Sequence, residues 1–534
     1  MKGLFFVLVS FIGSFAFCQS FNFPYSVSLN PISIQGFNGL HSYAFASQGN
    51  KVILIGGRKD GLHARQPFNA FPANYNNADI ILLDLDQQTS LSVSLSSLPL
   101  SISEQLQSTN TNFYQENDTL YIIGGYSYTA SAQDHITHNK LTAVHVSSLI
   151  QAMESNQPVS PSFEQLSDTL FGVTGGQLGR IGTTFYLVGG HRFDGRYNPM
   201  GNATYVQHYV NGYRNFQLKR INGQLTLANV TQTTDQFHLH RRDYNLLPHK
   251  YATGERGYLI SAGVFQYNAD LPFLYPVEIN ESGYQAHSTF SQFLSHYHCA
   301  KAHIHSSANH VTHSLFFGGM SQYQWVNNVL IEDQGVPFVK TISRLSRDDQ
   351  GNFEEVALPV QMPQFSGSSA EFIPYHSLQF VDHELLDQSQ FMSDSTLIGH
   401  IVGGINSPEA HPFNTNNTGV TSASSVVYEV WLKPESTNQL KPVEQTAPFE
   451  VLVSPNPAKS VVNFQITVPY KSEMEVFVTD AAGKLIDETY FEKCNSGKKT
   501  YKLDPTRFKS GKYTFNFLFD ARYVRSKQVI IQVD

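Results

Sequence analysis

The sequence predicts an all-β protein built from at least two domains. Its 534 residues exceed several times the usual size of one domain, about 150 residues. Charged residues make up only 15% of the chain and aromatic residues 13%, and 37 glycines and 24 prolines interrupt it, which is typical of many short strands and turns. A strand motif that ends in two glycines also recurs along most of the chain. The formal net charge of -8 argues against a protein that binds nucleic acid or another polyanion.

The N-terminus has the features of a signal peptide over residues 1–18. Lys2 supplies a positive charge, the apolar run Leu4–Phe17 follows, and Ala16 and Cys18 place small residues at the two positions that specify cleavage. We therefore expect cleavage after Cys18. The alternative is a lipid-modified Cys18, but the bulky Phe17 stands where a lipoprotein signal has a small residue. No later stretch reaches about 18 uninterrupted apolar residues, so we expect no transmembrane segment in the mature chain.

A linker is predicted at residues 433–448. This segment contains three prolines among polar residues and shows no apolar periodicity, as a semi-extended linker requires. The division predicts a large domain over 19–432 and a small domain over 449–534. Cys299 and Cys494, which remain after cleavage, lie on opposite sides of the linker. We therefore expect no structural disulfide, and stability must come from a buried core.

Six copies of one motif organise the large domain. In each copy an apolar strand ends in a pair of glycines, except that alanine takes the first place in the fourth copy. Glycines are expected where neighbouring repeats converge near a common axis, because a Cβ would clash there and the chain must turn sharply. The six pairs are Gly56–Gly57, Gly124–Gly125, Gly189–Gly190, Ala262–Gly263, Gly318–Gly319 and Gly403–Gly404.

Each motif strand has neighbours that complete a four-stranded unit. An extended segment precedes it, for example Leu40–Phe45 or Tyr375–Phe380, and a further strand such as Ile80–Leu85 follows. The large domain thus resembles a kelch-type β-propeller of six blades. The usual kelch tryptophan and Tyr-Asp signature is largely missing, and the second glycines are 56 to 85 residues apart, against roughly 50 in a kelch repeat, so long loops are expected. The last repeat is short of strands, so we predict that the free strand pattern Tyr25–Ile34 closes the ring.

The small domain alternates apolar and polar residues in short runs separated by turns. This pattern predicts an antiparallel, immunoglobulin-like sandwich of about seven strands. Asn456 lies between two prolines at an entry turn, Gly483 provides the positive φ of a hairpin turn, and Gly511 precedes an inward-packing aromatic residue. The residues that carry a family resemblance are Pro455, Asn456, Pro457, Gly483, Gly511 and Tyr513. In their order and terminal position they resemble the C-terminal sorting domain of type IX secretion cargo.

The resemblance implies an export route. The signal peptide would carry the chain across the inner membrane, and the type IX machinery of Bacteroidetes-type bacteria would be the partner that takes it to the outer-membrane surface or the medium. The alternative reading of the small domain is a generic immunoglobulin-like adhesion module.

Candidate ligand-binding residues fall in the loops after the glycine pairs and in histidine-rich segments. Arginine, aspartate and aromatic side chains in such loops can bond to and stack on sugars or carboxylates. Histidines spaced two apart, as in 238–240, 296–298 and 303–305, would share one side of a strand and suit a metal. The candidates are Arg58, His191, Arg192, Asp194, Arg196, Arg241, Arg242, His298, His303, Tyr375 and His376. The alternatives are solvated salt bridges in the loops and polar residues that line a wet channel.

A short constellation is similar to that of galactose oxidase, a copper-dependent propeller enzyme. Tyr375, His376 and Ser377 stand where that family has a Tyr-His pair at a strand start, and Cys299 stands at a comparable place one repeat earlier. The cysteine and the Tyr-His pair come in the reverse order, however, and no second tyrosine can be assigned. We therefore assign no catalytic residue, no metal ligand and no cofactor, and keep copper or zinc as the alternative.

The sequence thus favours a secreted or surface-displayed propeller that binds a glycan or a protein ligand. The alternative is an extracellular propeller enzyme that acts on carbohydrates or depends on a metal. A third hypothesis, a purely structural surface protein, predicts that no concave site exists.

Overall fold

The computed structural model describes residues 21–66, 69–198, 204–391, 394–435, 443 and 448–533. The predicted signal peptide lies outside the described residues, as do 436–442 and 444–447 of the predicted linker. Strands dominate the described part of the chain, which confirms the all-β prediction.

Six four-stranded antiparallel units, in the part of the chain that the structure describes, each contain one copy of the glycine motif. Every motif strand is the second strand of its sheet, counted from the innermost. The first three sheets are β2(Ala44–Gln48), β3(Lys51–Ile55), β4(Asp79–Asp84), β5(Thr89–Ser94); β6(Asn112–Glu116), β7(Thr119–Ile123), β10(Lys140–His145), β11(Phe163–Ser167); and β12(Gln177–Ile181), β13(Thr184–Val188), β16(Gly212–Ile221), β17(Gln224–Thr234). The next three are β18(Asn245–Lys250), β19(Arg256–Ser261), β20(Val277–Asn280), β21(Gly283–Ala286); β22(Lys301–Ser306), β23(Val311–Phe317), β26(Thr341–Asp348), β27(Phe353–Gln361); and β28(Phe365–Pro374), β31(Thr396–Ser407), β33(Val426–Pro434), β1(Tyr25–Ser33).

Insertions between these strands form smaller elements. Helix α2(Val146–Glu154) buries Val146, Leu149, Ile150 and Met153 on one face, against a core cluster of the first two repeats. The inserted elements are a sheet of β8(Tyr126–Thr129), β9(Asp134–Thr137), β14(His191–Gly195) and β15(Tyr205–Tyr209), the hairpins β24(Tyr323–Val326)–β25(Val329–Glu332) and β29(Phe380–Asp382)–β30(Leu385–Asp387), the short strand β32(Ser422–Ala423), and the helices α1(Leu100–Leu106) and α2(Val146–Glu154). Single 3₁₀ turns occur at η2(Ala73–Tyr75), η3(Leu95–Ser97), η4(Ser160–Ser162), η5(Thr169–Phe171), η6(Gln388–Phe391), η7(Thr418–Val420) and η8(Pro505–Arg507).

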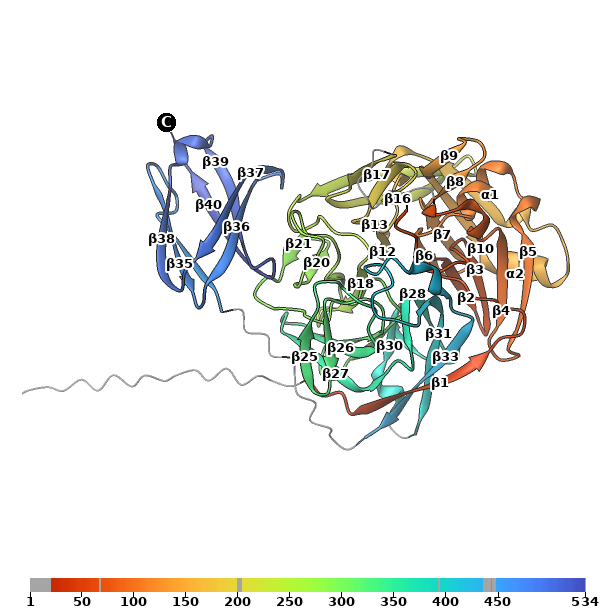
Figure 1. Ribbon diagram of the computed structural model, residues 1–534. Coiled ribbons are helices and arrows are strands. Elements are labelled where there is room, and N and C mark those ends of the chain that lie inside the picture. The colour runs from red at the N-terminus through yellow and green to blue at the C-terminus, as the bar shows by residue number, and fades with distance from the viewer. Residues whose placement is uncertain are drawn as a thin grey trace, which may run out of the picture.

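The six repeats close into a ring around a common axis (Figure 1). Each repeat contributes one residue to this ring, located shortly before or within its innermost strand. The main-chain N–H of this residue donates to the main-chain carbonyl of the equivalent residue in the preceding repeat, and the first repeat donates to the last, at 2.7 to 3.1 Å. The six residues of this hydrogen-bonded ring are Ser42, Asn110, Gly175, Asp243, His298 and Ser369. A cycle of bonds that returns to its start requires a closed disc, so the fold is a β-propeller.

The glycine pairs sit at the junctions between repeats. The N–H of Gly404 donates to Leu40 O at 2.9 Å and so joins the last repeat to the first. Gly403 has a φ of +67, and a Cβ there would lie 2.1 Å from Leu40 O. Gly124 is equivalent, since its Cβ would lie 1.9 Å from Val173 O in the next repeat. A Cβ does not fit at Gly124 or Gly403, which is the physical reason for glycine there, whereas the fourth repeat accommodates Ala262 at the same place with a φ of +51.

Strand β1 closes the ring as predicted. It pairs antiparallel with β33 along its whole length, from Tyr25 opposite Pro434 to Ser33 opposite Val426. Figure 1 shows the first and last strands of the ring side by side. The strand prediction for Tyr375–Phe380 was wrong: the innermost strand of the last repeat is β28, and Tyr375–Phe380 lies after it. The chain makes an insertion there before it returns as the motif strand β31.

The C-terminal domain is a two-sheet sandwich of seven strands in the described residues, as predicted. One sheet is β34(Glu450–Ser454), β35(Val462–Val468) and β38(Gly497–Leu503), and the other is β37(Leu485–Cys494), β36(Ser472–Asp480), β39(Gly511–Phe519) and β40(Tyr523–Ile531). Asn456 bonds across to β40 at Gln528 O and Ile530 N. Gly483 has a φ of +73, and Tyr513 packs in the core between the sheets. Cys299 and Cys494 are both buried and free.

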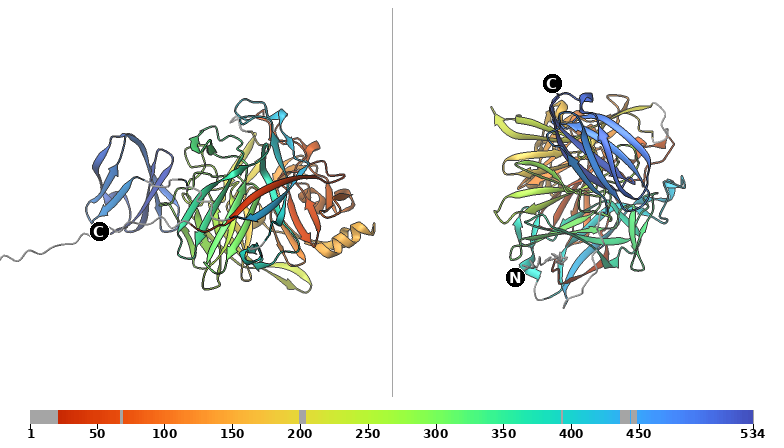
Figure 2. Two further views of the ribbon diagram at one scale, coloured as in Figure 1. Left: turned by 90° about the horizontal axis from the view of Figure 1, so that it is seen from below. Right: turned by 90° about the vertical axis from the view of Figure 1, so that its left-hand side faces the viewer.

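The C-terminal domain packs against the third, fourth and fifth repeats (Figure 2). Phe477 on β36 is fully buried, with its ring centroid 5.0 Å from that of Phe237. The N–H of Leu485 donates to Gln236 Oε1 at 2.7 Å. A Cβ on Gly483 would lie 2.0 Å from Thr234 O, so this glycine is required by the interface as well as by its turn.

Candidate functional site

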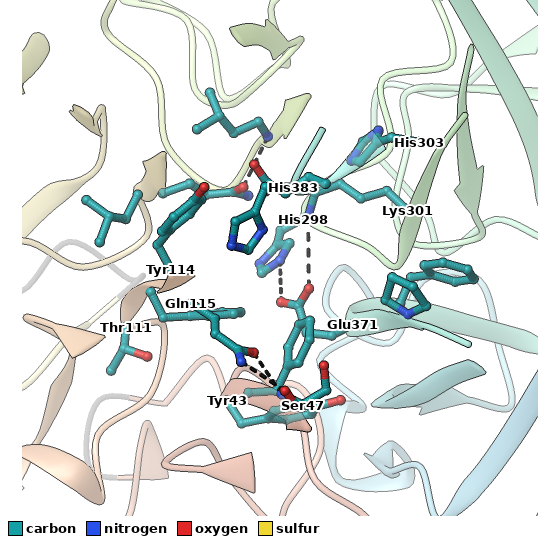
Figure 3. Close-up of a pocket in the computed structure, with 18 of the residues that line it drawn as sticks. Tyr43, Ser47, Thr111, Tyr114, Gln115, His298, Lys301, His303, Glu371 and His383 are labelled. Carbon is teal, nitrogen blue, oxygen red and sulfur yellow. Dashed lines mark hydrogen bonds and ion pairs between the residues drawn. The ribbon is translucent and has the colours of Figure 1, made fainter. Parts of the chain in front are cut away.

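A cavity lies on the axis of the propeller, bounded at one end by the hydrogen-bonded ring. Its volume is about 320 Å³. The innermost strands of all six repeats contribute to its wall, because alternate side chains of these strands point toward the axis. The inserted hairpin β29–β30 supplies residues at the other end. Figure 3 shows the labelled polar and aromatic side chains of this wall.

A buried carboxylate forms the charged centre of the cavity. Glu371 on β28 is only 4% exposed, and its Oε1 lies 2.9 Å from His298 Nε2. Lys301 Nζ lies 3.9 Å from the other oxygen, Oε2. Burial raises the pKa of Glu371, but the charges of His298 and Lys301 and a hydrogen bond from His298 outweigh burial, so the net shift is downward. The carboxylate is therefore ionised at neutral pH and can accept hydrogen bonds from a ligand.

Aromatic and hydroxyl groups line the remaining wall. Tyr114 is buried, and desolvation raises its pKa, so its hydroxyl stays protonated. Ser47 and Gln115 join the first two repeats, since the N–H of Ser47 donates to Gln115 Oε1 at 2.8 Å and Gln115 Nε2 donates to Ser47 O at 2.9 Å. Thr111 Oγ1 is buried without a hydrogen-bond partner. The cavity thus combines flat apolar surfaces with unsatisfied polar groups.

The hairpin β29–β30 is inserted in the last repeat and reaches across the cavity. Strand β30 pairs in parallel with β22, with Leu386 opposite Ile304. Toward the tip, the Tyr258 hydroxyl donates to Glu384 Oε2 at 3.0 Å, and the His383 ring packs 5.3 Å from that of Tyr114. The last, fifth, fourth and second repeats therefore meet at this end of the cavity.

Loops that begin at the glycine pairs pack together across the ring from the cavity. Arg58 bonds to Asp60 and to Asn76 Oδ1 at 3.0 Å, and it is only 2% exposed. His63 lies 5.2 Å from Tyr197, measured between ring centroids. These side chains pack against one another, so this face is a cap of aromatic rings and ion pairs rather than the open mouth that the loop composition suggests.

The sequence candidates divide between these two places. Four of them line the cavity: His298, His303, Tyr375 and His376. The other seven do not line it: Arg58, His191, Arg192, Asp194, Arg196, Arg241 and Arg242. Arg241 is completely buried, where it donates to the carbonyl oxygens of His238 and Tyr275. Its position allows a structural role only.

The remaining six candidates belong to the cap and its rim. His191 is buried, and its Nδ1 lies 2.8 Å from Gln207 Nε2. Arg196 Nε donates to Ala70 O at 2.8 Å. Arg58 forms an ion pair with Asp60, and Arg192 forms one with Asp194. Arg242 donates to Asp243 Oδ2 at 2.8 Å and to the hydroxyl of Tyr209.

The local structure around two histidine pairs differs from the prediction. Residues 238–240 and 296–298 lie in turns and loops, not in strands, because they lead into the ring where the chain changes direction. Only His303 and His305 lie on a strand, β22, as expected. Tyr375 and His376 come after β28 and not at a strand start, with His376 Nε2 3.4 Å from Asp86 Oδ2.

The sequence reasoning did not identify five residues that shape the cavity: Lys301, Glu371, Tyr114, His383 and Glu384. Glu371 had a detectable signal, since it is a single acid inside the apolar run that precedes a motif strand. The others had none, because they come from different repeats and from the insertion.

Two further properties of the described residues bear on chemistry and location. No group of three or more His, Cys, Asp or Glu in this part of the chain is arranged to hold a metal ion. No helix among the same residues is long and apolar enough to cross a membrane.

Comparison with known proteins identifies the C-terminal domain. Residues 452–532 match the family described as secretion system C-terminal sorting domain. This domain directs export by type IX secretion, so the protein reaches the cell surface or the extracellular medium. The protein is an exported β-propeller with a C-terminal sorting domain. A comparison with curated protein sequences finds no match.

Two solved structures are similar to this chain. One, titled "Structure of YjhT", is 10% identical with a TM-score of 0.42, and the match covers 76% of this chain and 98% of that chain. The other is titled as a novel fungal alcohol oxidase of the AA5 family in complex with copper. It is 9% identical with a TM-score of 0.35, over 95% of this chain and 99% of that chain. The propeller architecture of this chain rests on its own sheets and closed ring of hydrogen bonds.

Proposed function

We propose that this exported propeller binds a saccharide in the axial cavity. The observation that carries the proposal is the buried Glu371 carboxylate, held beside His298 and Lys301 in a cavity with aromatic walls. Sugars present hydroxyl groups for such a cluster and apolar ring faces for aromatic side chains. A carboxylate that faces a cation within the same site leaves little net charge, which suits a neutral ligand.

The size of the cavity supports a small molecule over a protein ligand. Its volume of about 320 Å³ is at the lower end of the range for small-molecule pockets, about 300–1,000 Å³. The wall is built mostly from the rigid innermost strands, so the site is largely preformed. A glycan enters such a site as a terminal sugar or a short oligosaccharide.

The test is binding of the full-length mature protein to a glycan array, followed by titration calorimetry with the best ligand. Glu371→Gln should weaken binding about 10- to 100-fold, because a hydrogen bond to a charged group contributes about 1.5–3 kcal/mol. The matched control is Glu164→Gln, which removes a carboxylate that pairs with Arg220 and does not line the cavity. Absence of any saccharide ligand, or equal affinities for the two variants, would contradict the proposal.

A second candidate is catalysis on the bound sugar. The observation that favours it is the pair His298 and Glu371, because an imidazole held by a carboxylate can move protons. Nuclear magnetic resonance of a bound sugar during prolonged incubation distinguishes the two functions. New signals that disappear with His298→Gln would support catalysis, and an unchanged spectrum would support binding alone.

A further inference from the structure

One arginine of the fourth repeat forms ion pairs with the tip of the inserted hairpin. Arg256, at the start of β19 in the fourth repeat, forms ion pairs with Asp382 and Glu384 of the last repeat. The distance from its Nη1 to Asp382 Oδ1 is 3.4 Å. Its guanidinium lies 5.1 Å from the ring centroid of Tyr258. No other cation pairs with these two carboxylates among the described residues.

The base and the tip of the hairpin are held by different forces. At the base, β30 pairs with β22, and Leu386 is 1% exposed within a core cluster. At the tip, Phe380 is 42% exposed, and the contacts across to the fourth repeat are polar. They are the Arg256 pairs, the Tyr258 bond to Glu384 and a bond from Lys250 Nζ to Val381 O at 3.3 Å. The side chains of Asp382 and Glu384 are 29% and 34% exposed and that of Arg256 is 10% exposed, so dissolved salt screens these pairs from the carboxylate side.

The tip also forms part of the cavity. Phe380, His383, Glu384 and Leu386 all line it, opposite the innermost strands. The other end of the cavity is bounded by the hydrogen-bonded ring and, beyond the ring, by the packed cap of loops. A ligand that reaches Glu371 therefore enters at the end of the cavity that the hairpin tip borders together with Gly49, Tyr375 and His376.

We propose that the tip of the β29–β30 hairpin is an ionic latch over the axial cavity, and that Arg256 is its positioning residue. The latch determines access to the cavity and completes its wall with the His383 and Glu384 side chains. This inference rests on the proposed function only for the identity of the ligand, since access to the cavity can be measured without one.

The experiment uses a cysteine placed inside the cavity of the full chain. Thr111→Cys replaces a buried side chain that lines the cavity with one of similar size. The natural cysteines of the mature chain, Cys299 and Cys494, are buried and provide the background rate. A methanethiosulfonate reagent then reports, by mass spectrometry, how fast the cavity is reached.

Adding Arg256→Gln should speed labelling of Thr111→Cys about tenfold, which corresponds to about 1.4 kcal/mol in the opening equilibrium. Because the latch is ionic, raising the salt concentration should speed labelling of the parent and leave the Arg256→Gln variant unchanged. The double variant Asp382→Asn with Glu384→Gln tests the same contacts from the hairpin side, where folding is less at risk. Arg256→Lys keeps the charge and should restore part of the slow rate.

The control is Arg220→Gln, which breaks an ion pair on outer strands away from the cavity. It should leave the labelling rate unchanged. Equal labelling rates in the parent, the Arg256 variant and the hairpin variant, with folding verified by circular dichroism, would overturn the latch. If the latch variants behave as expected but no glycan binds, the proposed ligand is wrong and the latch stands.

Discussion

The closure of the ring can be tested by adding a single methyl group at Gly403. This residue lies where the last repeat meets the first, with a φ of +67. An alanine Cβ there would lie 2.1 Å from Leu40 O and 3.0 Å from Tyr43 Cε1. Neither the carbonyl nor the residue itself can rotate away, because the adjacent Gly404 N–H donates to the same oxygen at 2.9 Å.

Two effects determine the cost of Gly403→Ala. A non-glycine residue in the left-handed region costs roughly 1–2 kcal/mol. Relief of the clash must also move the two repeats apart and weaken the junction hydrogen bond, worth about 1 kcal/mol, together with the packing around it. The expected total is about 3–5 kcal/mol, among the larger effects of a single substitution.

The assay is urea unfolding of the full-length protein, compared with a matched glycine. Gly223 has a φ of +82 at the β16–β17 hairpin, and a Cβ there would meet nothing within 4 Å. Gly223→Ala should therefore cost only the conformational term, about 1–2 kcal/mol. If Gly403→Ala is no more destabilising than Gly223→Ala, the contact between the first and last repeats does not hold the ring closed.

Two further predictions concern domain docking and pH. Phe477→Asp should undock the sorting domain, because it places a charge in the apolar contact with Phe237, and small-angle X-ray scattering should then show a larger radius of gyration. Tyr490, on the same sheet, is 52% exposed, so the control Tyr490→Asp should leave the scattering unchanged. Equal scattering curves for Phe477→Asp and Tyr490→Asp would contradict the docking. Burial lowers the pKa of His296 to about 4, so the unfolded chain takes up the proton first, and stability should fall as the pH drops from about 6.5 toward 4. The free energy of unfolding, measured with urea at each pH, should therefore fall less steeply with decreasing pH in His296→Gln, because this variant lacks the one group that takes up the proton. The exposed control His208→Gln should keep the slope of the parent protein.

The strands could be predicted because their pattern is local. In the sorting domain, alternating residues such as those of Val462–Val468 face either the opposite sheet or solvent, and the period of two is visible in the sequence. The glycine pairs were equally informative, since a left-handed residue without room for a Cβ permits almost only glycine. The segment Tyr375–Phe380 was predicted as an innermost strand but lies in an insertion, and composition alone does not separate the two.

The functional site could be predicted only in part, because it is assembled from repeats far apart in the chain. His298 and Glu371 are separated by 72 intervening residues, and they meet because the fifth and sixth repeats are neighbours in the ring. The loop arginines attracted attention by composition, yet Arg241 is completely buried and Arg58 is held by Asp60. Charge in a loop does not show whether that charge faces a ligand or another loop.

The sequence by itself determined the all-β class, the glycine-marked repeats, the closing strand and the sorting domain, since each depends on the conformation or spacing of neighbouring residues. Only the tertiary structure decided which side of the ring holds the cavity, that Glu371 is its charged centre and that a hairpin covers it. Those features depend on which side chains of different repeats converge on one axis, and that convergence is a property of the closed ring.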